Sequence, residues 1–206
     1  MSKILVTGAS GFLGKSVSEY FSNKGHEVFS LTRQDLDVTN KGQVTDWFRQ
    51  NKVDFVIHTA VKGGRRGNYD SFSDYVANIK MFENLFENKH RFSMMIHFAS
   101  GAEFDRKNHI NCFKEDRIFD SMPEDFYGLS KNMIARKIIK HKTNIYNFRL
   151  FGCFGKDEEE NRLLKILSKG IEEQSETFIE GRKTMDFFYD KDVCRAIEYY
   201  MDNYKK

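Results

Sequence analysis

Residues 7–14 read Thr-Gly-Ala-Ser-Gly-Phe-Leu-Gly and stand between a short apolar run and a segment with helical spacing. The apolar run, residues 3–7, is predicted to be a buried strand, and residues 12–23 are predicted to be a helix. Glycines at such a turn let the backbone come close to a ligand, and the free N–H groups at a helix start attract phosphate. Glycines alone can mark an ordinary turn, but a first strand, a glycine turn and a first helix together predict dinucleotide binding.

The alternation of strand-like and helix-like segments continues along the chain. Further strands are predicted over residues 27–31, 54–59, 93–99 and 144–150, and helices over 41–51, 72–88 and 121–141. Ser121 and Glu124 resemble a capping box for the last of these helices, with Pro123 in its first turn. Alternating helices and continuously apolar strands predict an α/β fold with a doubly wound parallel sheet of the Rossmann type.

The pattern loosens after the fifth predicted strand. Residues 161–206 are predicted to form a helix, two short strands and a closing helix. We therefore expect a dinucleotide-binding Rossmann domain over residues 1–155. Residues 156–206 are expected to form a short substrate cap that is partly merged with this domain.

Composition excludes several classes of protein. The chain has 206 residues, of which 40% are hydrophobic and 31% charged, so a disordered protein is excluded. Its net charge of +3 is too small to indicate the strongly basic surface of a nucleic-acid-binding protein. No apolar run is long enough for a signal peptide or a membrane span, so a soluble cytoplasmic protein is expected. The 6 histidines do not cluster with cysteines or carboxylates at ligand spacing, so no metal site is predicted.

The glycine spacing carries a family resemblance. Gly-x-x-Gly-x-x-Gly directly after Thr7 resembles the extended short-chain dehydrogenase/reductase superfamily, in particular its NAD-dependent epimerase/dehydratase family, which modifies nucleotide sugars. The resemblance implies that the turn holds the pyrophosphate of the cofactor. The residues implied to do so are Gly8, Ser10, Gly11, Phe12, Leu13 and Gly14.

The end of the second predicted strand bears on the choice of cofactor. An acidic residue there would bind the ribose 2′-hydroxyl of NAD, whereas this chain has Thr32 and Arg33, which could bind a 2′-phosphate. NADP(H) is therefore favoured, and NAD(H) remains open because Asp35 is close enough to take the acidic role. The following segment resembles that of NADPH-dependent 4-keto-sugar reductases, which implies that Asp37 bonds the adenine amino group and that Val38 lies beside it.

Tyr127 and Lys131 are the predicted reacting pair. They stand four residues apart, and thus on one face of a predicted helix, where an ammonium would lower the pKa of the phenol and make it a useful acid or base. Such pairs also occur on ordinary amphipathic helices, but the position between the fourth and fifth strands favours catalysis. The resemblance implies that Lys131 also binds the nicotinamide ribose. It further implies that Ser100, in Ser-Gly-Ala-Glu-Phe at the end of the fourth strand, is the catalytic hydroxyl that orients the substrate oxygen. The alternative for Ser100 is a strand-end cap.

Other positions match the family less specifically. Thr59 and Ala60 stand where the family lines its cofactor, and Asn78 matches an Asn that supports the active site and that we count with the cofactor residues. Each could equally serve packing. Arg182 and Lys183 could meet the diphosphate of a substrate.

The resemblance implies an NAD(P)-dependent nucleotide-sugar epimerase, dehydratase or 4-keto-reductase, with hydride transfer at a sugar carbon and Ser–Tyr–Lys acid/base chemistry. An alternative is a catalytically silent NADP(H)-binding regulatory or partner subunit, because Gly152 and Met185 replace the substrate-contacting Asn and Arg of the family. A third alternative is a reductase of another small carbonyl compound. A homodimer is expected through the helices over 72–88 and 121–141, where Ile134 and Ile138 serve either the interface or the core.

Overall fold

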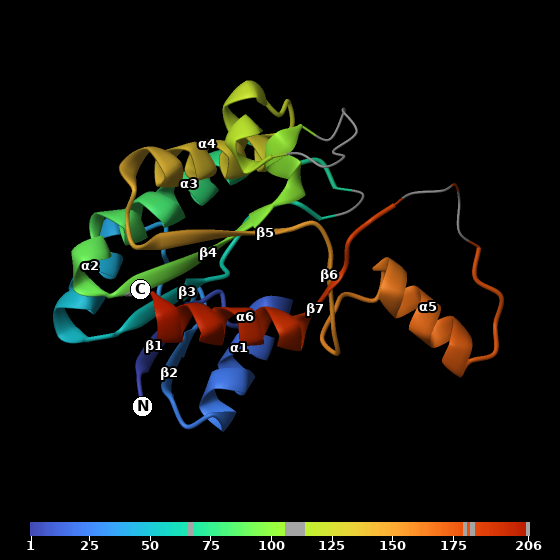
Figure 1. Cartoon of the computed structure of the whole chain (residues 1–206), viewed down its shortest axis with the longest axis horizontal. Coiled ribbons are helices and arrows are strands. Elements are labelled where there is room, and N and C mark those ends of the chain that lie inside the picture. Colours follow the sequence, from blue (N-terminus) through green and yellow to red (C-terminus); the bar gives the residue numbers. More distant parts are fainter. Residues whose placement is uncertain (66–67, 106–113, 179–180, 182–183, 205–206) are drawn as a thin grey trace.

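The computed structural model describes residues 1–65, 68–105, 114–178, 181 and 184–204. Its central sheet is parallel, with five strands in the order β2-β1-β3-β4-β5 (Figure 1). The strands are β1 (Lys3–Thr7), β2 (Glu27–Leu31), β3 (Phe55–His58), β4 (Met94–Ser100) and β5 (Ile145–Leu150). The predicted doubly wound parallel sheet is therefore confirmed.

Helices cover both faces of this sheet, as Figure 1 shows. These helices are α1 (Phe12–Asn23), α2 (Lys41–Gln50), α3 (Phe72–Glu87), α4 (Phe126–His141) and α6 (Asp190–Asn203), and a further helix, α5 (Leu163–Glu172), does not cover the sheet. Helices α1 and α6 pack on one face through an apolar cluster that includes Val17, Phe21 and Ile197. Helices α2, α3 and α4 pack on the opposite face through a cluster that includes Val44 and Phe82. Helix α6, which was expected in the cap segment, thus belongs to the layers around the sheet.

Helix α4 begins after Asp125, so its predicted start at Ser121 is wrong. The carboxylate of Asp125 accepts the N–H of Gly128 at 2.7 Å, which makes Asp125 the N-cap. Ser121 instead ends a 3-10 turn, and its hydroxyl donates to the carbonyl of Arg117 at 3.4 Å. The reason lies in Pro123, because the residue before a proline avoids helical backbone angles.

A smaller sheet joins residues on either side of α5. It pairs β6 (Cys153–Phe154) with β7 (Phe188–Tyr189) in parallel. The two short strands predicted within 161–206 are therefore corrected, because β7 is the one strand of the described part of that segment and its partner precedes it. Helix α5 stands apart from the central sheet (Figure 1). Three 3-10 turns complete the described elements: η1 (Lys89–Arg91), η2 (Gly101–Phe104) and η3 (Glu115–Asp120).

The described residues contain neither a membrane-spanning helix nor a cluster of metal ligands. None of their helices has both the length and the apolar character needed to cross a bilayer. Within the same residues, no three His, Cys, Asp or Glu side chains come together as they would around a metal ion.

Candidate active site

The glycine turn between β1 and α1 leaves no room for side chains at two of its positions. Gly8 has a φ of 71°, and a Cβ there would lie 2.6 Å from the Cα of Ala60. A Cβ on Gly14 would lie 2.3 Å from the carbonyl oxygen of Gly8. Gly11 is different, because it is exposed and its added Cβ would meet the oxygen of Gly8 at 3.4 Å. Gly8 and Gly14 therefore shape the turn, whereas Gly11 leaves one side of it open.

The start of α1 offers hydrogen-bond donors beside this turn. Gly11 is the N-cap and provides no side chain to bond the first turn, which contains no acidic residue. Ser10 is exposed, and Phe12 and Leu13 are half-buried. An uncapped helix start above a tight glycine turn fits an anionic pyrophosphate, because backbone N–H groups and the helix dipole both favour negative charge there.

The segment that follows β2 carries a cationic side chain, Arg33, and two acidic ones, Asp35 and Asp37. The backbone N–H and the hydroxyl of Thr32 donate to Asp35 at 2.9 and 2.6 Å, and these bonds lower the pKa of Asp35. The guanidinium of Arg33 is 68% exposed and lies 3.7 Å from the carboxylate of Asp37. Bonds from Thr39, followed by the weaker effect of Arg33, lower the pKa of Asp37. Arg33 is thus exposed enough to meet a phosphate, while Asp37 is held in place.

The residues after β3 form a hydrogen bond to the end of β1 and pack against the glycine turn. The hydroxyl of Thr59 donates to the carbonyl of Thr7 at 2.7 Å. Ala60 lies directly against Gly8, which is why that glycine has no room for a Cβ. Val38 is buried, and Ala60 packs against the same apolar cluster. These residues line the edge of the sheet on which the predicted cofactor would lie.

The loop after β3 also reaches helix α4. The amide of Asn78 donates to the carbonyl of Lys62 at 2.9 Å and to the hydroxyl of Ser130 at 3.1 Å, and it accepts the N–H of Lys62 at 2.8 Å. Asn78 is 3% exposed and these bonds use its amide within the protein, so it supports the loop. A Cβ on Gly64 would lie 2.6 Å from the ring of Tyr127, so the loop backbone lies against that ring.

Tyr127 and Lys131 come together as predicted from their spacing. Tyr127 lies in the first turn of α4, and the ammonium of Lys131 lies 5.8 Å from the centroid of its ring. Lys131 is 5% exposed and donates to the carbonyl of Phe98 at 2.6 Å. Burial lowers the pKa of Lys131 to about 8, and the charge of Glu103 acts against this effect.

Ser100 ends β4, the strand that precedes α4 in the chain. Its hydroxyl accepts the N–H of Ala102 at 3.2 Å, so the strand-end cap considered from the sequence is present. A hydroxyl that accepts one bond keeps its proton for another partner, so this cap is compatible with donation to a substrate oxygen.

A row of polar side chains crosses the sheet beneath Lys131. Thr7, His58, His97 and Asn147 are neighbours in register on four adjacent strands. The hydroxyl of Thr7 and Nδ1 of His58 are 2.7 Å apart, and the two imidazole rings lie 5.4 Å apart. Burial, and then the charge of Lys131, lower the pKa of His58 to about 3. The pKa of His97 is lowered by the same causes, so both imidazoles are neutral at physiological pH and add no positive charge near Lys131.

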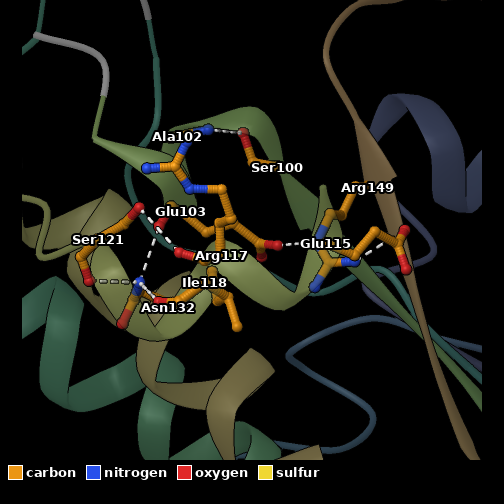
Figure 2. A network of polar contacts seen from close by, with 9 residues as sticks. All are labelled: Ser100, Ala102, Glu103, Glu115, Arg117, Ile118, Ser121, Asn132 and Arg149. Carbon is orange, nitrogen blue, oxygen red and sulfur yellow. Dashed lines mark hydrogen bonds and ion pairs between the residues drawn. The ribbon is translucent and has the colours of Figure 1, made fainter. Parts of the chain in front are cut away.

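A buried network connects the end of β4 with α4 and β5 (Figure 2). Glu103 forms an ion pair with Arg149, and Arg149 also contacts Glu115 at 2.9 Å. The amide of Asn132 donates to the carbonyl of Glu103 at 2.8 Å. Sequence reasoning did not single out Glu103, although it lies in the segment quoted for Ser100. Arg182 and Lys183, the predicted substrate contacts, lie outside the described residues.

Known proteins resemble this chain in sequence and in fold. The sequence model of the NAD dependent epimerase/dehydratase family matches residues 4–206. GDP-L-colitose synthase of Yersinia pseudotuberculosis is 25% identical over 227 residues, which cover 99% of this chain and 73% of that protein. dTDP-4-dehydrorhamnose reductase of Aggregatibacter actinomycetemcomitans is 30% identical over 170 residues, which cover 81% of this chain and 56% of that protein. Among solved structures, MlghC, the GDP-mannoheptose C4 reductase from Campylobacter jejuni with NADP bound, has a TM-score of 0.83 at 21% identity, covering 98% of this chain and 75% of that one.

Proposed function

Because the chain belongs to the NAD dependent epimerase/dehydratase family, we propose that it is a cytoplasmic NADP(H)-dependent enzyme that acts on the sugar of a nucleotide sugar. The relatives named as GDP-L-colitose synthase and dTDP-4-dehydrorhamnose reductase support this substrate class. The reaction is hydride transfer at a sugar carbon, as 4-keto reduction or as part of epimerisation or dehydration. The observation that carries the proposal is the burial of Lys131 beside the Tyr127 ring, on the helix next to the strand that ends in Ser100.

Each of these residues has a distinct role. Ser100 donates a hydrogen bond that orients the substrate oxygen, and Tyr127 gives a proton to that oxygen or removes one from it. Lys131, when charged, stabilises the phenolate form of Tyr127. A nicotinamide cofactor, when bound, would supply or accept the hydride. Segment 156–206 is proposed to contribute the substrate side, with Arg182 and Lys183 as contacts of the diphosphate.

The purified protein tests this proposal directly. Mass spectrometry identifies any nucleotide that copurifies, and absorbance at the reduced nicotinamide band follows NADPH oxidation with GDP-linked and dTDP-linked 4-keto sugars. Tight NADPH binding without oxidation of any of them would favour the silent subunit. The departure at Gly152 does not require lost catalysis, because a Cβ there would lie 2.9 Å from the carbonyl oxygen of Asp186. Oxidation with a carbonyl compound that carries no nucleotide would favour the third alternative.

Arg33→Ala is expected to weaken NADPH binding roughly 10- to 100-fold and to change NADH binding little. A charged hydrogen bond to the 2′-phosphate contributes about 1.5–3 kcal/mol, and NADH lacks that phosphate. Fluorescence titration with both cofactors measures the ratio of dissociation constants. Arg49→Ala is the matched control, since Arg49 is also exposed and paired with a nearby carboxylate, 2.9 Å away on Asp46. Equal losses for NADPH and NADH would contradict the assigned role.

Turnover in the direction of reduction is expected to fall as pH rises through about 8, the value to which burial lowers the pKa of Lys131. Below that pH the charged Lys131 stabilises the phenolate that remains when Tyr127 has given its proton, and above it this help is lost. Initial rates of NADPH oxidation across this range measure the profile. Lys131→Arg should stay active to higher pH at a lower maximal rate, because guanidinium remains charged. A wild-type rate that is level well above pH 8 would contradict the expectation.

A homodimer through α3 and α4 is part of the proposal. Ile134 and Ile138 are buried in the core, so they are not available for an interface. Exposed apolar side chains on and beside these helices are the candidates instead, namely Phe72, Phe119, Met122, Met133 and Ile139. Sedimentation velocity should show a dimer, and Met133→Glu should shift it towards monomer. A monomer in the wild type would refute this part.

A further inference from the structure

The turn formed by Gly63 and Gly64 lies against the aromatic ring of Tyr127. Both glycines have a φ of 74°, a left-handed conformation that residues with a side chain rarely adopt. A Cβ on Gly64 would lie 2.6 Å from Cε2 of Tyr127 and 2.8 Å from Cζ, the ring carbon that carries the hydroxyl. Because Gly64 has no side chain, the backbone of the turn borders the ring close to its hydroxyl end.

Asp70 holds this turn at Gly64. The carboxylate of Asp70 accepts the backbone N–H of Gly64 at 2.7 Å, and a Cβ on Gly63 would lie 2.3 Å from its Oδ1. Asp70 is half-buried and directly precedes Ser71, the N-cap of α3. Ser71 and Asp74 form a complete capping box, so the backbone next to Asp70 is itself held by the start of a helix.

Asn78 holds the other end of the same turn and connects it to α4. The backbone N–H and carbonyl of Lys62 both bond the amide of Asn78, at 2.8 and 2.9 Å. That amide also donates to the hydroxyl of Ser130 at 3.1 Å, and this hydroxyl donates to the carbonyl of Tyr127 at 2.7 Å. Residues before and within α3 therefore hold the turn on both sides of its glycines, and the turn in turn contacts Tyr127.

The place of the Tyr127 ring is not set by its helix alone. Helix α4 fixes the backbone of Tyr127, but its side chain is only half-buried and has rotatable bonds of its own. Contact with the backbone at Gly64 restricts this rotation near the hydroxyl. Proton transfer needs the reacting atoms at hydrogen-bond distance, and a misplacement of about 1 Å can lower a rate by about 10²-fold. A residue that holds the turn can thus affect turnover without touching the substrate.

We propose that Asp70 is a positioning residue of the active site, which holds the backbone of Gly64 against Tyr127 and thereby sets the place of the phenol hydroxyl. The catalytic part of this inference rests on the proposed function, whereas the contact between the turn and the ring does not. Asp70 acts through a backbone N–H group and contacts neither substrate nor cofactor in this role.

The NMR signal of Tyr127 tests the positioning without any substrate. In protein with ¹³C at the tyrosine Cζ atoms, the Tyr127 signal is the one missing from Tyr127→Phe. Asp70→Ala removes the acceptor and should shift this signal, whereas Asp70→Asn should leave it near wild type, because an amide oxygen still accepts the N–H of Gly64. Asp54→Ala is the matched control, since Asp54 accepts the backbone N–H of Lys3 at the same 2.7 Å, at the other end of β3. An unmoved Tyr127 signal in folded Asp70→Ala would overturn the proposal.

Steady-state kinetics separate positioning from a general loss of structure. Asp70→Ala should lower kcat roughly 10-fold, with KM and NADPH affinity nearly unchanged, because the reacting hydroxyl moves while the binding sites stay in place. Asp70→Asn should recover most of kcat, and Asp54→Ala should keep the wild-type value. The proposal is wrong if Asp54→Ala loses as much turnover as Asp70→Ala, or if Asp70→Asn is as slow as Asp70→Ala.

Gly64→Ala takes the place of Asp70→Ala if that variant does not fold. Its added Cβ would collide with the ring of Tyr127, so the Tyr127 signal should shift and kcat should fall roughly 10-fold. Gly25→Ala is the matched control, because Gly25 has a φ of 83° and an added Cβ there meets no atom of the described residues within 4 Å. It carries the same kind of backbone strain without any contact with the ring. Equal signals and equal rates in these two glycine variants would overturn the proposal.

The two readouts distinguish this inference from the proposed function. Suppose that the Tyr127 signal moves in Asp70→Ala and returns in Asp70→Asn, but that the protein oxidises no NADPH with any nucleotide sugar. The positioning of Tyr127 by the turn would then stand, and the proposed function would fall. Normal turnover of the wild type, together with an unmoved signal in Asp70→Ala, would do the reverse.

Discussion

Tyr127→Phe is expected to lower kcat by about 10²–10⁴-fold, the range that one positioned acid or base contributes, and to leave NADPH affinity nearly unchanged. The substitution removes only the hydroxyl. The ring keeps its contact with the backbone at Gly64 and its place beside the ammonium of Lys131, so the helix and the loop stay as they are. Stopped-flow or steady-state NADPH oxidation measures kcat, and fluorescence titration measures the affinity.

Tyr199→Phe is the matched control for this variant. Tyr199 is exposed on α6, which covers the opposite face of the sheet from α4, and its hydroxyl should not matter for turnover. If Tyr127→Phe turns over at the wild-type rate, the phenol is not the acid or base, and the proposed mechanism is refuted. If NADPH affinity falls together with kcat, the hydroxyl has a binding role in addition to its chemical one.

Gly14→Ala is expected to abolish measurable NADPH binding and to lower the free energy of unfolding by about 1–3 kcal/mol. Alanine is favoured over glycine by about 1 kcal/mol inside a helix, so propensity alone predicts the opposite sign. The clash decides the sign here, because the added Cβ would lie 2.3 Å from the carbonyl oxygen of Gly8, which is backbone and cannot rotate away. The displaced turn would then no longer fit a pyrophosphate.

Gly11→Ala separates binding from folding within the same turn. Its Cβ would meet the nearest atom at 3.4 Å, so the variant should unfold at nearly the wild-type temperature. It should nevertheless bind NADPH less tightly, because the methyl group projects on the open side of the turn. Thermal unfolding and fluorescence titration of both variants measure the two effects. A Gly14→Ala protein with wild-type stability and affinity would show that the turn is not the cofactor site.

The local spacing of apolar residues and glycines was sufficient to predict most strands and helices of the central sheet and its covering layers. The strand over residues 3–7 and the helix over 12–23 have the predicted bounds, because each is defined by its own apolar spacing and by glycines at its ends. The start of α4 was wrong because two cap signals compete within a few residues. Asp125 caps the helix in place of Ser121, and Pro123 between them disfavours an earlier start.

The candidate site was predictable where its residues share one element. Tyr127 and Lys131 are four residues apart on a helix, so their proximity follows from helical geometry. The pair of Glu103 and Arg149 joins residues 46 positions apart, and no spacing rule indicates that both are buried. The pairing of β6 with β7 across α5 was missed for the same reason, since each strand has only two residues and no periodicity of its own.

The packing of α6 against α1 affects the order in which the molecule assembles. Ser16 lies 3.9 Å from Cys194, and the hydroxyl of Tyr20 donates to Glu198 at 2.8 Å, each across 178 positions of sequence. Part of one face of the sheet therefore stays uncovered during synthesis until α6 has left the ribosome. Contacts of such long range slow folding, because the entropy of closing the loop is lost before the contacts form. We expect nascent chains that lack α6 to need chaperones, whereas changes within α5, which stands apart from the central sheet (Figure 1), should leave the folding rate nearly unaffected.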